Sequence, residues 1–173
     1  MDILDLNDMD KITENIYFGN MYSAININNL KKEGIKKILS IVELPKINYE
    51  EENITQKLIK IFDMPNRNII KYFGECLNFM EGEEKILVHC RNGTSRAATI
   101  VIAYVIWKQK MNYEDAYNFV KIKRKHIGPN NGFKEQLKIF ENLMVKNNYD
   151  LNKIDFDNIE RCGKSNYFEL NNK

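Results

Sequence analysis

The sequence has little of what extracellular, zinc-binding or disulfide-rich proteins need. Its 173 residues include only 3 cysteines and 2 histidines. Cys76, Cys90 and Cys162 are unevenly spaced, odd in number and without the Cys/His pairs that hold zinc. We therefore expect an intracellular protein, from a reducing compartment, that has no metal site and no disulfide framework.

An excess of charge of one sign and long apolar runs are also missing. The 26 basic and 24 acidic side chains leave a formal net charge of +2, too small for the basic face of a nucleic-acid-binding protein. The longest apolar run, residues 97–107, has about half of the roughly 20 residues that span a bilayer. The N-terminus carries acids where a signal peptide has bases, and neither end matches a lipidation motif. We expect a soluble protein of the cytoplasm or nucleus, with no nucleic-acid partner and no stable membrane attachment.

The chain does contain alternating strand and helix patterns, with 43% hydrophobic residues to build a core. Short apolar runs predict buried strands at residues 16–18, 37–42, 57–62 and 86–88. Helical periodicity predicts helices around residues 24–33, from 69, at 97–107, from 113 and from 133. This order predicts an α/β fold.

The periodicity ends near residue 147, beyond which asparagine and charged residues accumulate. We therefore predict one globular domain over residues 1–146, followed by a tail over residues 147–173. Its composition predicts a tail that is partly disordered or packed on the surface.

Residues 89–96 join the strand at 86–88 to the buried helix at 97–107, and they place Cys90 and Arg96 at the two ends of a loop. A cysteine attacks phosphorus only as a thiolate. The positive end of the helix and a ring of backbone N–H groups can stabilise both a thiolate and three phosphoryl oxygens. The N–H groups that can converge on phosphate belong to Arg91, Asn92, Gly93, Thr94 and Ser95.

Two side chains of this loop suit phosphate chemistry in particular. Gly93 permits a backbone turn that a Cβ would obstruct. Arg96 offers a planar fork that grips two oxygens and stabilises the group in transfer. The loop therefore predicts phosphate binding with Cys90 as the nucleophile; the alternative is a merely structural, buried cysteine.

The segment from Val88 to Arg96 resembles the active-site signature of the dual-specificity protein phosphatases. The similarity covers roughly residues 12–146 and is closest to the small single-domain (atypical) members. It is carried by residues 16–19, 34–39, 102–104 and 127–137, and by Asp63, Asn68 and Phe73.

The resemblance implies a central, mainly parallel sheet flanked by helices, no cofactor and no metal. It implies a cysteine-dependent phosphatase of the protein tyrosine phosphatase superfamily, with a shallow pocket for phosphotyrosine and also for phosphoserine or phosphothreonine. The partners would be phosphoprotein substrates, kinases among them.

Asp63 is the candidate general acid. Expulsion of an alkoxide or phenoxide needs a proton donor, and the same carboxyl can then activate the water that cleaves the phosphocysteine. Asp63 follows a predicted strand on a Pro-containing loop, from which a side chain can approach a rigid site. The resemblance assigns this role to Asp63, and the alternative is that it only begins the turn into the next helix.

Three further residues are expected at the loop by resemblance. His89 would buttress the loop by hydrogen bonding, unless it is simply a packed histidine. Arg91 would favour acidic phosphopeptides, unless it is an ordinary solvated charge. Asn130 is expected to support the loop from the turn that precedes the last helix.

A basic cluster at the end of a predicted helix comprises Lys121, Lys123, Arg124, Lys125 and His126. Cations suit the negative end of a helix and usually face water. The alternative is a docking patch for a second phosphate or an acidic segment of the substrate, with Arg124 as the contact by resemblance. Cys76 is assigned to the core, or otherwise to a disulfide with oxidised Cys90.

Two other functions remain open at this point. The same loop chemistry serves phosphatases of inositol lipids or RNA 5′ ends, although lipid-specific loops tend to carry a second basic residue where Thr94 stands, and no membrane-binding basic helix is evident. A slow-turnover phosphopeptide-binding (trapping) module is the third reading, which Ala97 keeps open even though Cys90, Arg96 and Asp63 are all present.

Ala97 stands where the family usually has Ser or Thr, whose hydroxyl helps to stabilise the leaving thiolate during phosphoenzyme hydrolysis. The phosphatases of regenerating liver also carry Ala there. We expect slow hydrolysis of the phosphocysteine, seen as a pre-steady-state burst of product, and faster turnover in Ala97→Ser. Rapid-mixing kinetics with an aryl phosphate check this: linear product release from time zero in both proteins would contradict it.

Overall fold

The structure of the chain is a computed structural model that describes residues 9–162 and 167–170. The acidic start of the chain and tail residues 163–166 and 171–173 lie outside the described residues, as does the side chain of Cys162. No helix within the described part has the length and hydrophobicity to cross a bilayer.

A five-stranded sheet forms the centre of the domain, in the order β1-β2-β5-β3-β4. Its strands are β1 Met9–Lys11, β2 Ile16–Gly19, β3 Lys37–Ile41, β4 Thr55–Ile59 and β5 Ile86–His89. Three of its pairings are parallel, and β1 lies antiparallel to β2. The predicted α/β class with a mainly parallel sheet is confirmed.

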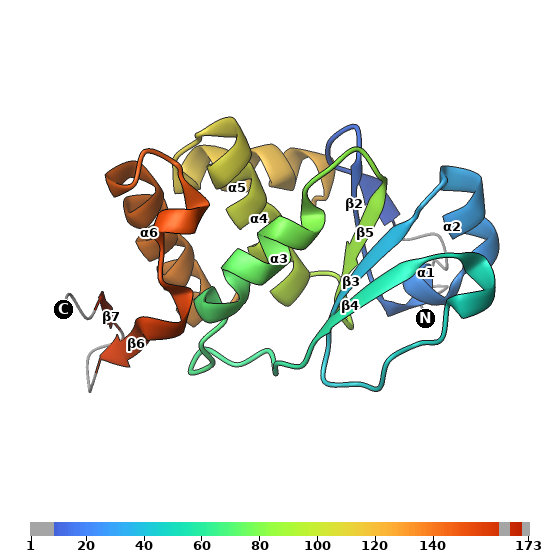
Figure 1. Cartoon of the computed structure of the whole chain (residues 1–173), viewed down its shortest axis with the longest axis horizontal. Coiled ribbons are helices and arrows are strands. Elements are labelled where there is room, and N and C mark those ends of the chain that lie inside the picture. Colours follow the sequence, from blue (N-terminus) through green and yellow to red (C-terminus); the bar gives the residue numbers. More distant parts are fainter. Residues whose placement is uncertain (1–8, 163–166, 171–173) are drawn as a thin grey trace.

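Helices cover both faces of the sheet (Figure 1). One face carries α1 Met21–Ile25 and α2 Ile27–Glu33. The other carries α3 Phe73–Met80, α4 Arg96–Gln109, α5 Tyr113–Lys123 and α6 Asn131–Lys146. Short 3₁₀ turns occur at Glu50–Glu52, Ile70–Tyr72, Leu151–Lys153 and Phe156–Asn158.

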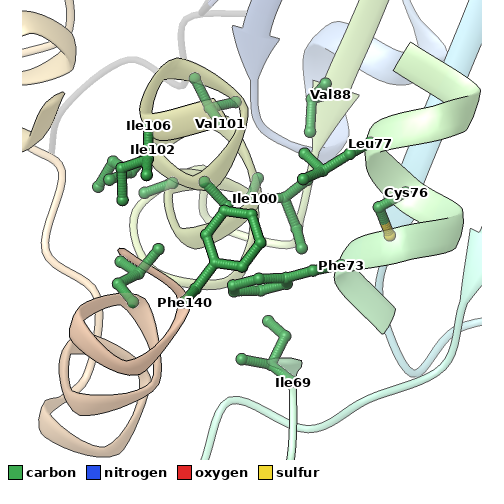
Figure 2. Close-up of a cluster of buried hydrophobic side chains, with 14 of the residues drawn as sticks. Ile69, Phe73, Cys76, Leu77, Val88, Ile100, Val101, Ile102, Ile106 and Phe140 are labelled. Carbon is green, nitrogen blue, oxygen red and sulfur yellow. The ribbon is translucent and has the colours of Figure 1, made fainter. Parts of the chain in front are cut away.

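The strands alternate between two cores because successive side chains point to opposite faces of a sheet. Leu87 of β5 joins the smaller core with side chains of α1 and α2, whereas Ile86 and Val88 join the larger one. Figure 2 shows part of the larger core, where the rings of Phe73 and Phe140 meet edge to face with centroids 5.0 Å apart. Burial on both sides explains why these strands are continuous apolar runs in the sequence.

Cys76 points into the larger core from α3 (Figure 2). Its side chain is fully buried, as expected of a core residue. Burial raises the pKa of the Cys76 thiol, which suppresses the thiolate needed for attack on an oxidised Cys90.

The first predicted helix is in fact two helices, because Asn26 interrupts it. The Asn26 side chain accepts a hydrogen bond from the Asn29 amide at 3.2 Å and so caps α2. Its own backbone N–H donates to Ser23 at the end of α1. Asparagine competes with the helical backbone in this way and is therefore common at helix starts.

The strand predicted at residues 57–62 begins and ends earlier, as β4. Its parallel partner β3 ends at Ile41, which lies opposite Ile59. Beyond that point the ladder has no partner, and the carbonyl of Ile61 instead accepts a hydrogen bond from Arg96 at 3.1 Å. The end of β4 is therefore set by the end of its partner strand rather than by the apolar pattern, which continues to Phe62.

The predicted tail contributes to the domain core. Leu151, Ile154 and Ile159 are buried in the larger core, and the carbonyl of Ile159 accepts a hydrogen bond from the Asn68 side chain at 3.0 Å. Strands β6 Ile159–Cys162 and β7 Tyr167–Leu170 then pair antiparallel. The packed domain thus continues past the end predicted at residue 146. The apolar residues beyond it complete the core, but they are isolated in the sequence and form no periodic pattern.

We expect Leu151→Ala to lower the free energy of unfolding by about 2–4 kcal/mol, the usual cost of removing a buried leucine side chain. Denaturant unfolding measures this. Val145→Ala, at a position of α6 that is 57% exposed, is the matched control and should change stability by no more than about 0.5 kcal/mol. Equal stability of the two variants would mean that residues 147–159 are not part of the folded unit.

Candidate active site

The loop between β5 and α4 is held from outside through its carbonyl groups. Because all described peptide bonds are trans, the N–H that follows each anchored carbonyl points the opposite way, toward the inside of the loop. These donors belong to Asn92, Thr94 and Ser95. The anchoring bonds run from Met21 N to Arg91 O at 3.1 Å, from Arg124 Nε to Gly93 O at 3.0 Å and from Gly128 N to Thr94 O at 2.8 Å.

Gly93 fits where no other residue would. Its φ is +64°, a left-handed conformation that favours glycine. A Cβ there would lie 2.7 Å from the carbonyl oxygen of Gly19 and 2.6 Å from a guanidinium nitrogen of Arg124. The loop can therefore lie against β2 only with glycine at this position.

Cys90 directly follows β5, and its side chain is buried at the base of the loop. α4 begins at Arg96 and runs for 14 residues, so its positive end lies at the loop. Inward N–H groups and a helix N-terminus together form an anion site, which suits both a thiolate and a phosphoryl group.

Arg96 is buried and its guanidinium is fixed on one side. Nη1 pairs with the carboxylate of Glu43 and donates to the carbonyl of Ile61 at 3.1 Å. Nε is buried and has no hydrogen-bond partner among the described residues. This arrangement leaves the Nε edge to donate to the oxygens of a phosphoryl group.

Glu43 is a residue that the sequence analysis missed. Besides Arg96 it contacts Arg91, with Nη1 3.7 Å from its carboxylate. Partial burial raises the pKa of Glu43, but the hydrogen bonds from its own backbone and from Arg96, with the charge of both arginines, outweigh this and lower it. The available signal was an acidic residue just beyond the carboxyl end of a buried strand, where sites of α/β sheets form.

Asp63 lies against the loop although it belongs to a separate, exposed segment, the acid loop of residues 62–68. Its Oδ1 accepts hydrogen bonds from Ser95 Oγ at 2.7 Å and from Asn130 Nδ2 at 2.8 Å. The backbone N–H of Asn130 in turn donates to Ser95 Oγ at 3.1 Å. Three segments far apart in the sequence thus bring one carboxyl to the loop that holds Cys90.

The acid loop is anchored on α6. Gln136 is fully buried, and its Oε1 accepts from the amides of Ile69 and Ile70 at 2.8 and 3.0 Å, while its Nε2 donates to the Arg67 carbonyl at 2.9 Å. Gly132 lies so close to this segment that a Cβ would come within 1.9 Å of the Pro65 carbonyl oxygen. The position of Asp63 is therefore set by the helix that follows the Gly128–Gly132 turn.

His89 lies beneath the loop in a buried polar chain. Its Nε2 is 2.7 Å from Ser40 Oγ, which also accepts from Gln56 Nε2 at 2.8 Å. Burial lowers the pKa of His89 to about 4, so the ring is neutral at physiological pH. The hydrogen bond of this neutral imidazole joins β5 to Ser40 of β3, and its Nδ1 has no hydrogen-bond partner among the described residues, so the role of His89 as a support of the loop stays a prediction.

Arg124 occupies a different place from the one expected. Its side chain has no exposed surface; it donates to Gly93, pairs with Asp10 at 2.6 Å and lies 4.8 Å from the ring centroid of Phe18. The prediction that Arg124 contacts a second phosphate is wrong, because it lies behind the loop and cannot reach a ligand.

The other expected loop side chains lie at the rim. Arg91 and Asn92 are exposed, and Thr94 is half-buried. The described residues contain no group of three His, Cys, Asp or Glu side chains placed to hold a metal ion.

We expect Glu43→Gln to lower kcat/KM at least about tenfold, because the Arg96 guanidinium loses a charge-assisted hydrogen bond worth about 1.5–3 kcal/mol. Steady-state hydrolysis of an aryl phosphate, with thermal unfolding as a check on folding, measures this. Glu83→Gln, at an exposed position, is the control for loss of one negative charge. A rate equal to that of the control would remove Glu43 from the positioning of Arg96.

Comparison with known proteins agrees with this geometry. The family model described as the dual specificity phosphatase catalytic domain matches residues 16–143. Dual specificity protein phosphatase MPK-4 of Drosophila melanogaster is 33% identical over 144 residues, which are 80% of this chain and 37% of that protein. Human dual specificity protein phosphatase 7 is 37% identical over 134 residues, or 75% of this chain and 32% of that protein. The chain thus spans about a third of the length of these curated relatives.

The fold agrees as well. The crystal structure of DUSP15 superposes with a TM-score of 0.78 at 32% identity, covering 92% of this chain and 99% of that one. The residues matched by the family model, 16–143, include β5, the loop with Cys90 and helix α4. The chain therefore belongs to the dual specificity phosphatase family.

Proposed function

We propose that this protein hydrolyses phosphotyrosine and phosphoserine or phosphothreonine in phosphoproteins through a phosphocysteine intermediate. The observation that carries the proposal is the position of Asp63, whose carboxyl is hydrogen-bonded to Ser95 in the loop that holds Cys90. Nucleophile, anion site and proton donor are then within one constellation. The named relatives are protein phosphatases, which favours phosphoproteins over inositol lipids or RNA 5′ ends.

In the first step the Cys90 thiolate attacks phosphorus in line with the ester oxygen. The S–P bond forms as the P–O bond breaks, and Asp63 gives its proton to the departing oxygen. Arg96 and the inward N–H groups hold the three equatorial oxygens, where negative charge is concentrated in the transition state.

In the second step the Asp63 carboxylate takes a proton from water, and the water oxygen attacks phosphorus. The S–P bond breaks, which releases inorganic phosphate and returns Cys90 as a thiolate. Ala97 provides no hydroxyl for this thiolate, and the Thr99 hydroxyl, one turn beyond the loop, already donates to the Ser95 carbonyl at 2.8 Å. This engagement supports the slow second step expected from the sequence.

The proposed reaction also indicates the substrates of the protein and the cellular compartment that suits it. Phosphoproteins, kinases among them, are the substrates we propose. Because the nucleophile must remain a reduced thiol, the mechanism suits an intracellular, reducing compartment such as cytoplasm or nucleus.

Hydrolysis of an aryl phosphate and of matched phosphotyrosine and phosphoserine peptides tests the proposal. Cys90→Ser should abolish turnover. Asp63→Asn should lower kcat about 100-fold or more, with the larger loss on phosphoserine, whose alkoxide leaving group depends more on protonation. Turnover that survives Cys90→Ser would overturn the mechanism, and a normal rate in Asp63→Asn would remove Asp63 from it.

A further inference from the structure

A cavity lies beside the acid loop, and the proposed chemistry makes no use of it. Its volume is about 400 Å³, and its wall is formed by the two residues that follow β4, by the acid loop and by the 3₁₀ turn before α3. Three of the lining side chains are cations, Lys60, Arg67 and Lys71, and none of the lining residues is acidic. A concave surface with cations alone raises the local concentration of anions.

The three cations are available to a ligand. None of them forms an ion pair with a carboxylate among the described residues, whereas nearby Lys57 is paired with Glu75 at 2.9 Å. Within the described part of the chain, a ligand anion therefore has no carboxylate to displace at Lys60, Arg67 or Lys71.

Two of the cations are also held in place by aromatic rings. The guanidinium of Arg67 lies 5.6 Å from the ring centroid of Phe62, and Nζ of Lys71 lies 4.8 Å from that of Tyr72. Cation–π contacts restrict these long side chains without neutralising them. Binding an anion consequently costs less side-chain entropy than it would with free surface lysines.

The cavity is directly linked to the catalytic constellation. The carbonyl of Ile61 accepts from Arg96 at 3.1 Å, while its neighbours Lys60 and Phe62 line the cavity. Asp63 follows immediately. At roughly 3.3 Å per residue of extended chain, Lys60 lies within about 10 Å of Asp63.

We propose that this cavity binds an anionic side chain of the phosphoprotein substrate, a carboxylate or a second phosphate, close in sequence to the residue being dephosphorylated. The inference rests on the proposed function and adds a sequence preference to it. An extended peptide covers about 7–13 Å in two to four residues, so the anionic residue belongs two to four positions from the phosphorylated one. A peptide fits better than a lipid because the cavity is separate from the loop that holds Cys90 and its Lys60 lies within about 10 Å of Asp63, a distance that a short extended peptide covers.

The test compares kcat/KM for two phosphotyrosine peptides that differ only in having Glu or Gln at the positions two to four residues from phosphotyrosine on both sides. A third peptide has a single phosphothreonine at one of these positions, which separates a second phosphate from carboxylates. We expect the wild type to prefer the anionic peptides about tenfold, and this preference to decrease as salt is raised.

Two triple variants test whether the preference for anionic peptides depends on the cations of the cavity. In the cavity variant the preference should fall to about twofold or less, and in the control variant, which removes the same charge from exposed lysines elsewhere, it should remain. The cavity variant is Lys60→Gln/Arg67→Gln/Lys71→Gln, and the control is Lys32→Gln/Lys36→Gln/Lys146→Gln.

A single variant that reverses the charge of one lysine provides a test that does not depend on the folding of the triple variant. In Lys60→Glu we expect the Glu peptide to lose its advantage, and a matched Lys peptide to gain, with thermal unfolding recorded in parallel. The ratio between peptides is measured on one protein sample, so a loss of folded protein alone does not change it.

The outcomes separate this inference from the proposed function. If aryl phosphate and the Gln peptide are hydrolysed but no anionic preference exists, or if the cavity variant keeps it, the cavity inference is overturned and the phosphatase proposal stands. If no phosphate ester is hydrolysed, the proposed function itself has failed. If only vesicles containing a phosphoinositide show dependence on the cavity variant, the ligand is a lipid headgroup and the peptide inference is wrong.

Discussion

The loop that holds Cys90 depends on a cation that lies behind it and has no exposed surface. Arg124 is fully buried behind the loop, where it binds the Gly93 carbonyl and is neutralised by Asp10 of β1. A buried charge without a partner would cost several kcal/mol, so the ion pair fixes β1, the loop and the end of α5 relative to one another. The short edge strand β1 therefore has a role beyond pairing with β2.

Because the carbonyl groups of the loop are hydrogen-bonded on its outer side, the N–H groups of the same peptide units point toward its inside. Its inward N–H groups, the start of α4 and the Nε edge of Arg96 concentrate positive potential at one point. Glu43 keeps Arg96 in orientation from the far side and also contacts Arg91. The Glu43 carboxylate thereby reduces the repulsion between the guanidinium groups of Arg91 and Arg96. It leaves the Nε edge of Arg96 without a partner among the described residues.

Asp63, the proposed proton donor, is positioned by packing rather than by the strand that precedes it. Gln136 and Gly132 of α6 hold the acid loop, and Asn130 and Ser95 hold the carboxyl of Asp63. Asn68 ties the same loop to Ile159 of the C-terminal segment. The acid loop is thus connected to residues that are almost 100 positions away, and the cavity with Lys60, Arg67 and Lys71 lies along the same segment.

The sequence by itself determined the fold class and the strand–loop–helix unit, and it singled out Cys90, Gly93 and Arg96 as candidate residues for phosphate chemistry. These features are local: apolar periodicity marks elements, and a loop of this kind is contained in eight consecutive residues. The candidate roles of Asp63 and Asn130 came from resemblance, not from physical reasoning about spacing.

Only the tertiary structure decided which distant residues serve the loop. Sequence reasoning expected Arg124 either to face water, as a cation at a helix end usually does, or to contact a phosphate by resemblance. Its side chain is instead fully buried and paired with the partly exposed carboxylate of Asp10, 114 residues away. Glu43 was missed and Leu151, Ile154 and Ile159 were assigned to a tail for the same reason. Ion pairs and core packing join residues by position in space, and no periodicity in the chain records that proximity.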